Sequence, residues 1–228
     1  ASTIQSLAKK GLVAIAEREK LRLFAQPQVN ASQAPELTPA QQQACQTIRP
    51  LQGYHQVLLH GVTGSGKTEV YLQICGDRLG NGQSVLVLVP EIGLTPQLTD
   101  RFRARFGQKV AVYHSGLSSG EKYDTWRQTL LGHEQIVIGT RSAIFTPLPK
   151  LGLIILDEEH DSSFKQTQLT PNYHARTVAQ RRAELEQCPL ILGSATPSLE
   201  SWHMVHQHQD DSQRYYLELP ERVQSRPL

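Results

Sequence analysis

The chain of 228 residues has room for one large domain plus part of another, and its hydrophobic and charged fractions of 39% and 19% exclude a disordered protein. A formal net charge of only +2 excludes a globally basic surface, so any nucleic acid must be bound at local sites. No apolar run reaches the ~18 residues of a membrane span and no signal peptide is recognisable, so we expect a cytoplasmic protein without a membrane partner. Cys45, Cys75 and Cys188 match neither a zinc nor a disulfide pattern and are expected to be buried thiols.

The N-terminal part divides into a helical segment and a linker. Residues 1–24 begin with a helical pattern, followed by a basic pair, a glycine and a short strand-like tail, as at the end of many winged-helix domains. The sequence lacks an initiator methionine and enters helical periodicity at once, so we expect a fragment of a longer protein. Residues 25–36 are rich in proline, glutamine, serine and alanine, which is typical of a linker.

Short apolar runs alternate with helical patterns over residues 37–228. Runs bounded by turn residues lie at 56–60, 84–89, 109–113, 135–139, 153–156 and 189–193. Helical patterns lie at 68–79, 96–106, 123–131, 174–185 and 199–206. Short strands that are apolar on consecutive positions and alternate with helices indicate a parallel sheet covered on both faces. We therefore predict a doubly wound α/β domain, with ligands at the carboxyl ends of its strands.

The segment after the first predicted strand matches the phosphate-binding loop GxxxxGK[ST]. It reads GVTGSGKT at residues 61–68, follows a strand and opens a helix, which is the context that the motif requires. Its glycines let backbone N–H groups converge on phosphate oxygens, and the helix N-terminus adds its positive dipole end. Lys67 is predicted to reach the β and γ phosphates, and Thr68 to bind Mg²⁺; a chance glycine-rich turn is the alternative. The predicted nucleotide-binding residues of this loop are Gly61, Thr63, Gly64, Ser65, Gly66, Lys67 and Thr68.

Two acids, Asp157 and Glu158, follow the apolar run 153–156 directly. An acid at the tip of a buried strand is what a P-loop site needs to hold Mg²⁺, and a second carboxylate can accept a proton from the attacking water. We therefore predict Asp157 and Thr68 as metal ligands, and Lys67, Asp157 and Glu158 as catalytic residues. A strand that ends in acids at the solvent edge is the alternative, and the nearby P-loop disfavours it.

Three weaker patterns lie around these motifs. Thr38 suits the N-cap of a helix in which Gln41 would read the adenine edge; a capped surface helix is the alternative. Thr140 and Arg141 follow a strand and suit a nucleic-acid phosphate, or they form an ordinary surface loop. Residues 193–197 (GSATP) offer two hydroxyls at the same sheet edge, or they form a plain strand-to-helix turn.

Aromatic and basic side chains alternate just after the two acids. The segments are 164–166 (FKQ) and 173–176 (YHAR). Rings that stack on bases beside cations that neutralise phosphates are typical of single-stranded nucleic-acid binding. A mobile loop with incidental aromatics is the alternative. Further along the chain, His203, His206 and His208 match no common metal pattern and are expected to be surface residues at a helix end.

Taken in order, these motifs resemble those of superfamily-2 helicases and, among them, the bacterial replication-restart helicases of the primosomal protein N′ family. The likeness covers nearly the whole chain and rests on GVTGSGKTEVY, PEIGLTPQ, YHSGLS, GTRSAIFTP, DEEHDSSFKQ, YHAR and LGSATPSLE. It implies a RecA-like helicase lobe, lobe 1, at residues 37–228 and a winged-helix remnant at 1–24. The family's second motor lobe with its arginine finger, its zinc-binding cysteines and its 3′-end-binding domain are expected to lie outside this sequence, so zinc is not expected here.

The resemblance also implies roles for individual residues. It implies that Gln41 recognises adenine and that the P-loop and the two acids carry ATP chemistry. The residues implied to contact DNA, or to couple it to ATP hydrolysis, are Glu91, Thr95, Thr140, Arg141, Phe164, Tyr173, His174, Arg176, Ser194 and Thr196. Residues 167–172 depart from the family pattern, because they lack a further aromatic residue and the arginine expected before Tyr173.

The implied function is that of the ATP-binding motor lobe of a 3′-to-5′ DNA helicase that unwinds branched DNA and restarts stalled replication forks by primosome assembly. The implied cofactors are ATP and Mg²⁺, and the implied partners are forked and single-stranded DNA, single-stranded DNA-binding protein and other primosome proteins. Neither the NKxD motif of GTPases nor the LSGGQ motif of transport ATPases occurs. A binding module that keeps the nucleotide as a structural ligand is the remaining alternative, and the intact Glu158 favours the motor. The isolated lobe is expected to be nearly inactive.

Overall fold

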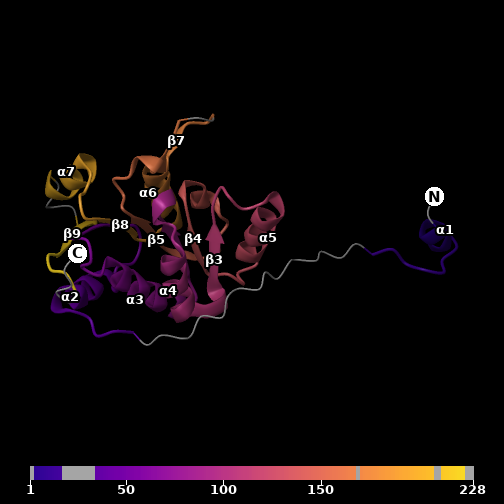
Figure 1. Ribbon diagram of the computed structural model, residues 1–228, viewed down its shortest axis with the longest axis horizontal. Coiled ribbons are helices and arrows are strands. Elements are labelled where there is room, and N and C mark those ends of the chain that lie inside the picture. Colours follow the sequence, from indigo (N-terminus) through magenta and orange to yellow (C-terminus); the bar gives the residue numbers. More distant parts are fainter. Residues whose placement is uncertain (1–2, 17–33, 168–169, 208–211, 224–228) are drawn as a thin grey trace.

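The main body of the protein is a seven-stranded parallel sheet between two layers of helices (Figure 1). The computed structural model describes residues 3–16, 34–167, 170–207 and 212–223. In sheet order the strands are β3 (Val110–Tyr113), β4 (Ile136–Gly139), β2 (Ser84–Leu88), β5 (Leu151–Asp157), β8 (Leu190–Ser194), β1 (Gln56–Gly61) and β9 (Arg214–Leu219). The predicted doubly wound parallel sheet is therefore confirmed.

Seven α-helices and several short elements complete the described chain. The α-helices are α1 (Thr3–Lys9), α2 (Pro39–Ile48), α3 (Lys67–Gly80), α4 (Pro96–Phe106), α5 (Ser119–Leu130), α6 (Ala175–Glu186) and α7 (Leu199–Gln207). The 3₁₀ helices are η1 (Glu91–Gly93), η2 (Gly107–Lys109), η3 (Arg141–Phe145) and η4 (Ser162–Phe164). A small antiparallel pair consists of β6 (Lys165–Gln166) and β7 (Tyr173–His174).

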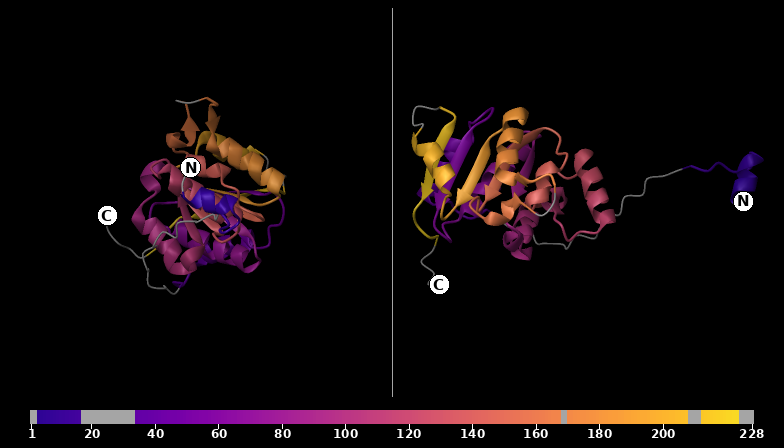
Figure 2. Two further views of the ribbon diagram at one scale, coloured as in Figure 1. Left: turned by 90° about the vertical axis from the view of Figure 1, so that its right-hand side faces the viewer. Right: turned by 90° about the horizontal axis from the view of Figure 1, so that it is seen from above.

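The sheet has a hydrophobic core on each face because side chains alternate along a strand. In β1, Val57 and Leu59 belong to the core under α2, α3 and α4, whereas Leu58 belongs to the core under η3, α6 and α7. Figures 1 and 2 show α6 on one face of the sheet and α3 and α4 on the other. Central strands are buried on both faces, which explains their continuous apolar sequences.

Side-chain caps begin several helices at the carboxyl edge of the sheet, where the predicted sites lie. Thr38 accepts a hydrogen bond from the Gln41 backbone N–H, and the Gln41 side chain accepts one in return from the Thr38 N–H. This capping box confirms the predicted N-cap. Thr95 caps α4, and Ser118 caps α5. Each cap satisfies N–H groups that the first helical turn leaves unpaired.

Two parts of the fold differ from the sequence expectation. The six predicted strands are all present, and β9 is a seventh that the prediction missed. β9 lies at the sheet edge and is mostly half-buried, so its sequence RYYLEL lacks a continuous apolar run. At the N-terminus, helix α1 ends at Lys9 and buries none of its residues. Residues 17–33, which hold the end of the predicted winged-helix remnant and most of the predicted linker, lie outside the described residues, so both assignments stay predictions.

Three smaller expectations can be compared directly with the structure. Cys45, Cys75 and Cys188 are buried free thiols, as predicted. His203 is exposed on α7 and His206 is half-buried there, while His208 lies outside the described residues. No group of three or more histidine, cysteine or acidic side chains in the described ranges is arranged to hold a metal ion. Among those same ranges, no helix has the length and apolar character needed to cross a bilayer.

The buried carboxyl of Glu134, between α5 and β4, should make the free energy of unfolding depend on pH. Its Oε2 atom is buried with no hydrogen-bond partner among the described residues. Burial raises the pKa of the Glu134 carboxyl from 4.5 to about 7, although Thr129 and Arg103 act in the opposite direction. Between pH 4.5 and about 7 the folded state therefore keeps a proton on Glu134 that the unfolded state has lost. The contribution of Glu134 to the free energy of unfolding is highest below pH 4.5 and falls as the pH rises through about 7, where the buried carboxyl must ionise.

We expect Glu134→Gln to stabilise the protein more at pH 8 than at pH 5, because the variant has no charge to bury at the higher pH. After allowance for the partial exposure of this side chain, the difference in the free energy of unfolding should be about 1–2 kcal/mol. Urea denaturation of both proteins at the two pH values measures it. The variant Glu184→Gln, at a partly exposed acid of α6 that pairs with Arg181, serves as a control. Equal stabilisation at both pH values would contradict the burial effect.

Candidate nucleotide-binding and catalytic site

The P-loop connects β1 to α3 at the carboxyl edge of the sheet. Gly64 and Gly66 have φ values of 82° and 83°, in the left-handed region that favours glycine. A Cβ atom at Gly66 would also collide with the side-chain nitrogen of Gln41. Because α3 begins at Lys67, the unpaired N–H groups of its first turn and its positive dipole end lie at this loop. The loop therefore has the backbone geometry of an anion-binding site.

A cavity of about 570 Å³ opens at this loop. Its walls are the P-loop, the first turns of α3, the acids after β5, and two arginines of α4, Arg101 and Arg105. Within the cavity region Ser65 Oγ is buried with no hydrogen-bond partner among the described residues, so this hydroxyl is available to an incoming phosphate. The segment after β9 completes the rim, where the Val223 N–H donates to the Gly64 carbonyl at 3.0 Å. The volume of the cavity, the hydrogen-bond donors of the P-loop and the positive charges of Lys67 and the two arginines thus suit a nucleotide.

Lys67 and Glu158 face each other inside this cavity. The Lys67 side chain is only 10% exposed, and its Nζ donates to the Gly61 carbonyl at 2.9 Å and lies 3.5 Å from Glu158 Oε1. The predicted phosphate-binding cation and the predicted base therefore share one site. An entering phosphate would compete with Glu158 for the ammonium group.

Asp157 ends strand β5 as a nearly buried carboxylate. Its Oδ1 accepts a hydrogen bond of 2.9 Å from the hydroxyl of Tyr71, a buried residue of α3 that the sequence did not single out. A Cβ atom at Gly193 would collide with that hydroxyl, so glycine is required there. Burial raises the pKa of Asp157, the Tyr71 hydrogen bond and Lys67 oppose this, and the Glu158 charge adds to it. A buried carboxylate that resists carrying an uncompensated charge fits a site for a cation.

An Mg²⁺ ion would be held here by the Asp157 carboxylate, the Thr68 hydroxyl and oxygens of the nucleotide. Mg²⁺ usually takes only one or two carboxylates from the protein when phosphates supply other ligands. The single acid at the end of β5 therefore suffices. Thr68 follows Lys67 at the start of α3 and lines the same cavity as Asp157.

Glu158 connects the cavity to the two hydroxyls predicted to couple ATP to DNA. Its Oε2 lies 3.7 Å from His160 Nδ1. That ring is hydrogen-bonded to both Ser194 Oγ, at 2.7 Å, and Thr196 Oγ1, at 3.3 Å. The structure thus connects Ser194 and Thr196 to Glu158 through His160, a residue that the sequence analysis did not assign.

Gln41 lies against the P-loop with both ends of its side-chain amide engaged. Its nitrogen donates to the carbonyls of Ser65, at 3.0 Å, and Gly66, at 3.4 Å, and its oxygen accepts from Thr38. The side chain is 2% exposed. The structure therefore places Gln41 at the nucleotide cavity, where it supports the loop, and its recognition of adenine stays a prediction.

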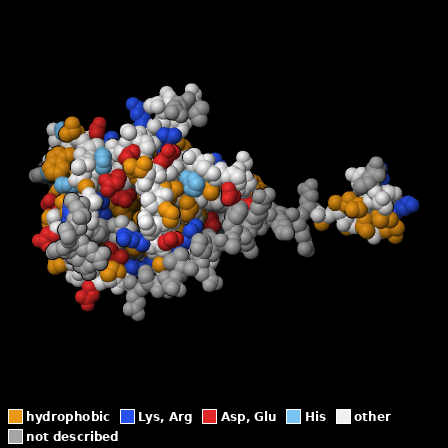
Figure 3. All heavy atoms as spheres, viewed as in Figure 1, with side chains coloured by type: hydrophobic (Ala, Val, Ile, Leu, Met, Phe, Trp, Pro, Cys, Tyr) orange, Lys and Arg blue, Asp and Glu red, His pale blue; other side chains and the backbone are white. Residues whose placement is uncertain are grey.

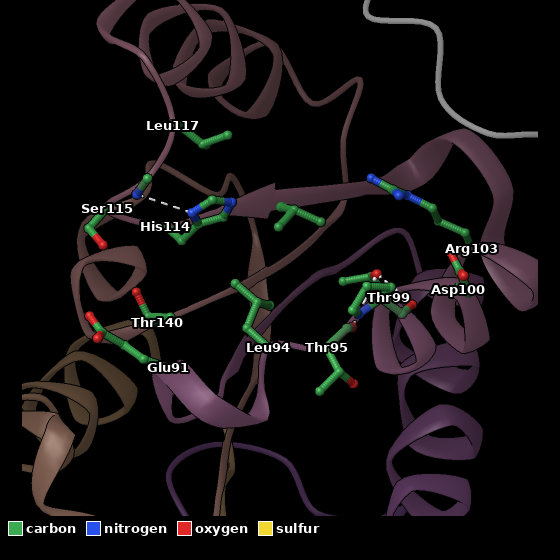
Figure 4. A pocket seen from close by; sticks show the side chains of 13 residues that line it. Glu91, Leu94, Thr95, Thr99, Asp100, Arg103, His114, Ser115, Leu117 and Thr140 are labelled. Atoms are coloured by element: carbon green, nitrogen blue, oxygen red, sulfur yellow. Dashed lines mark hydrogen bonds between the residues drawn. The ribbon is translucent and has the colours of Figure 1, made fainter.

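A second cavity, of about 1080 Å³, gathers three of the predicted DNA-contacting residues. Glu91, Thr95 and Thr140 line it, at the carboxyl ends of neighbouring strands. Figure 4 shows Glu91 and Thr140 on the same side of Leu94 as His114, whose Nδ1 accepts from the Gly116 N–H at 3.1 Å. His114 directly follows β3, so it too lies at the carboxyl end of a strand and lines this cavity, although the sequence analysis did not single it out. Over the face seen in Figure 3, acidic and basic side chains are interspersed.

The predicted aromatic segment is only partly a surface feature. Phe164 is fully buried in the core beneath η4 and α6, so it presents no ring to a base in this structure. Tyr173 is half-buried, and its ring packs edge-on against that of Phe145, with 5.2 Å between the ring centroids. Phe145 is 50% exposed and was not among the predicted site residues. Arg141 donates to the carbonyls of Ser163 and Lys165 and so holds this loop.

The two basic residues of the stretch 173–176, His174 and Arg176, are both engaged by the protein. His174 caps α6, where its ring accepts from the Arg176 N–H. The Arg176 guanidinium forms an ion pair of 2.9 Å with Glu159, so its main partner is a buried acid and not solvent. Residues 168 and 169, within the divergent stretch 167–172, lie outside the described residues.

Comparison with known proteins identifies relatives over the whole α/β body. Residues 38–205 match the model of the DEAD/DEAH box helicase family. The replication restart protein PriA of a Synechocystis strain is 94% identical over all 228 residues, which span 27% of its own length. The replication restart protein PriA of Bacillus subtilis is 51% identical over 205 residues, which cover 88% of this chain and 25% of that protein. The chain thus spans about a quarter of the length of these curated relatives.

Two solved structures share the fold. RecG bound to a three-way DNA junction matches with a TM-score of 0.59 and 24% identity, over 84% of this chain and 25% of RecG. The helicase domain of Pyrococcus furiosus Hef matches with a TM-score of 0.54 and 21% identity, over 78% of this chain and 37% of Hef. These structural matches confirm the fold, a RecA-like α/β lobe. The sequence matches confirm the predicted resemblance to replication-restart helicases. This chain belongs to the DEAD/DEAH box helicase family.

Proposed function

We propose that this chain is the ATP-binding motor lobe of a 3′-to-5′ DNA helicase that unwinds branched DNA and restarts stalled replication forks by primosome assembly. The observation that carries the proposal is the meeting of Lys67, Asp157 and Glu158 in one cavity at the start of α3, in a chain of the helicase family. The name "replication restart protein" that the relatives carry supports the role at stalled forks.

Each residue of the site has a distinct task in ATP hydrolysis. Lys67, the P-loop N–H groups and the Ser65 hydroxyl bind and orient the phosphates. Thr68 and Asp157 would hold Mg²⁺, which would neutralise charge on the phosphates. Glu158 accepts the proton of the attacking water, and His160 helps to hold its carboxylate. Tyr71 fixes the orientation of Asp157 through its hydroxyl.

Helix α4 is well placed to connect ATP with DNA. Arg101 and Arg105 line the nucleotide cavity, whereas Thr99 and Arg103 of the same helix, and its N-cap Thr95, line the second cavity. A rigid helix that borders both ligands would move with either of them. We therefore assign the second cavity to DNA. The proposed partners are forked and single-stranded DNA, single-stranded DNA-binding protein and other primosome proteins, and the proposed location is the cytoplasm.

An ATPase assay with and without single-stranded DNA tests this function in a full-length protein that carries this chain. We expect DNA to stimulate hydrolysis. The isolated 228-residue chain should bind Mg²⁺–nucleotide but turn ATP over very slowly, because an arginine finger from a second lobe supplies a factor of roughly 10³–10⁵ in rate. Absence of hydrolysis by the full-length protein would favour a module with a structural nucleotide. Unwinding by the isolated chain would contradict the assignment as one lobe.

A further inference from the structure

Glu159, the third acid after β5, is a completely buried carboxylate with a full set of partners. Its side chain is 0% exposed. Its oxygens accept from Arg176 Nη1 at 2.9 Å, from the Ser198 N–H at 2.7 Å and hydroxyl at 3.1 Å, and from the Ser201 hydroxyl at 2.9 Å. A buried carboxylate needs hydrogen-bond donors and a cation of this kind, because burying an unpaired charge costs much free energy.

The partners of Glu159 join three separate segments of the chain. Arg176 lies in the first turn of α6, at the end of the aromatic segment. Ser198 and Ser201 lie at the beginning of α7, after the hydroxyls of residues 193–197. Arg176 also donates to both serine hydroxyls, so carboxylate, guanidinium and hydroxyls form one network. We name this network, made of Glu159, Arg176, Ser198 and Ser201, the Glu159 cluster.

The backbone next to the Glu159 cluster is held in an unusual conformation. Glu158 has a φ of 49°, in the left-handed region that residues other than glycine rarely adopt. Such a conformation persists only when its surroundings hold it on both sides. On one side Asp157 is anchored by Tyr71; on the other, Glu159 is anchored by its cluster and by a hydrogen bond of 3.1 Å from its N–H to the Gly193 carbonyl. Of the acids 157–159, Glu158 is the one whose carboxylate pairs with Lys67.

We propose that Glu159 is a positioning residue for the catalytic base: by anchoring the turn after β5 to Arg176 and the start of α7, it aims the Glu158 carboxylate into the nucleotide cavity. Arg176 then acts by setting the position of this base and not by gripping a phosphate of DNA. The inference rests on the proposed function in one respect, the role of Glu158 in hydrolysis. A misplacement of a reacting group by about 1 Å can cost up to a hundredfold in rate, so a loosened turn should be measurable.

The test is a double-mutant cycle on ATP hydrolysis in a full-length protein that carries this chain. We expect Glu159→Gln to lower kcat about tenfold while the dissociation constant for Mg²⁺–ADP, measured by calorimetry, changes less than about twofold, because only the base is displaced. In a Glu158→Gln background the same substitution should lower kcat less than about twofold, since there is no base left to position. The matched control, Glu184→Gln, removes a partly exposed acid that pairs with Arg181 on α6, and it should leave kcat unchanged in both backgrounds.

A milder variant covers the case in which Glu159→Gln fails to fold. Ser201→Ala removes one donor to Glu159 and leaves its ion pair with Arg176 in place. It should lower kcat about two- to threefold, and this effect too should vanish in the Glu158→Gln background. Equal losses of kcat in both backgrounds, for either variant, would overturn the positioning role and leave the proposed function standing. A wild-type kcat in Glu158→Gln itself would overturn both.

Discussion

Replacing Lys67 by alanine is expected to weaken nucleotide binding by about 10- to 150-fold, the range that corresponds to the ~1.5–3 kcal/mol of a hydrogen bond to a charged group. Lys67 Nζ is nearly buried beside the P-loop, where it donates to the Gly61 carbonyl and lies 3.5 Å from Glu158 Oε1. Both of these are replaced by phosphate oxygens as its principal partners when a nucleotide binds. Fluorescence titration with a labelled ADP in the presence of Mg²⁺ measures the loss.

The fold should survive this substitution, because the Lys67 ammonium supports no part of the core. Circular dichroism and the melting temperature of Lys67→Ala should therefore match those of the wild type. Lys109→Ala, which removes an exposed lysine of η2, is the matched control and should bind nucleotide normally. Normal affinity in Lys67→Ala, with the fold intact, would refute the assignment of residues 61–68 as the phosphate cradle.

Replacing Glu158 by glutamine is expected to slow ATP turnover by about 10²–10⁴-fold, the contribution of a well-placed general base. Binding should be retained or become tighter, because Lys67 loses an ion-pair partner that competes with phosphate. Asp157→Ala should behave differently. It removes the predicted metal ligand, so it should weaken nucleotide binding in the presence of Mg²⁺ and leave the Mg²⁺-free affinity nearly unchanged.

The two variants are compared in a full-length protein that carries this chain, with kcat from steady-state hydrolysis and affinities from equilibrium titration at several Mg²⁺ concentrations. The comparison separates the task of the metal ligand from that of the base. Equal loss of Mg²⁺-dependent affinity in Glu158→Gln and Asp157→Ala would show that these two acids do not divide the work as proposed.

The fold was largely predictable because its core strands repeat one simple pattern. Strands β1, β2, β4, β5 and β8 are buried on both faces, so each appears in the sequence as a short continuous apolar run between turn residues. β9 was missed because an edge strand needs no such run. The pair β6 and β7 was missed because two residues per strand carry no period at all.

The nucleotide site was predictable where its residues are contiguous in a motif, and not where they meet only through folding. The P-loop is one continuous segment whose backbone does most of the binding. Tyr71 and Glu159 depend on partners in distant elements, Asp157 and Arg176, and no spacing in the sequence signals such pairs. Likewise, the alternation of aromatic and basic residues could not indicate that Phe164 faces the core while Phe145 faces outward.

Titration calorimetry of the 228-residue chain with ADP, once with Mg²⁺ and once with the metal chelated, tests the central claim most directly. The P-loop, Thr68 and Asp157 line one cavity of the described lobe, so we expect binding without a second lobe, with an affinity reduced by the open side of the cavity. We predict one nucleotide per chain in both titrations and a clearly higher affinity with Mg²⁺. No saturable binding in the presence of Mg²⁺, or the same affinity with and without it, would contradict the assignment of Thr68 and Asp157 to a metal–nucleotide site.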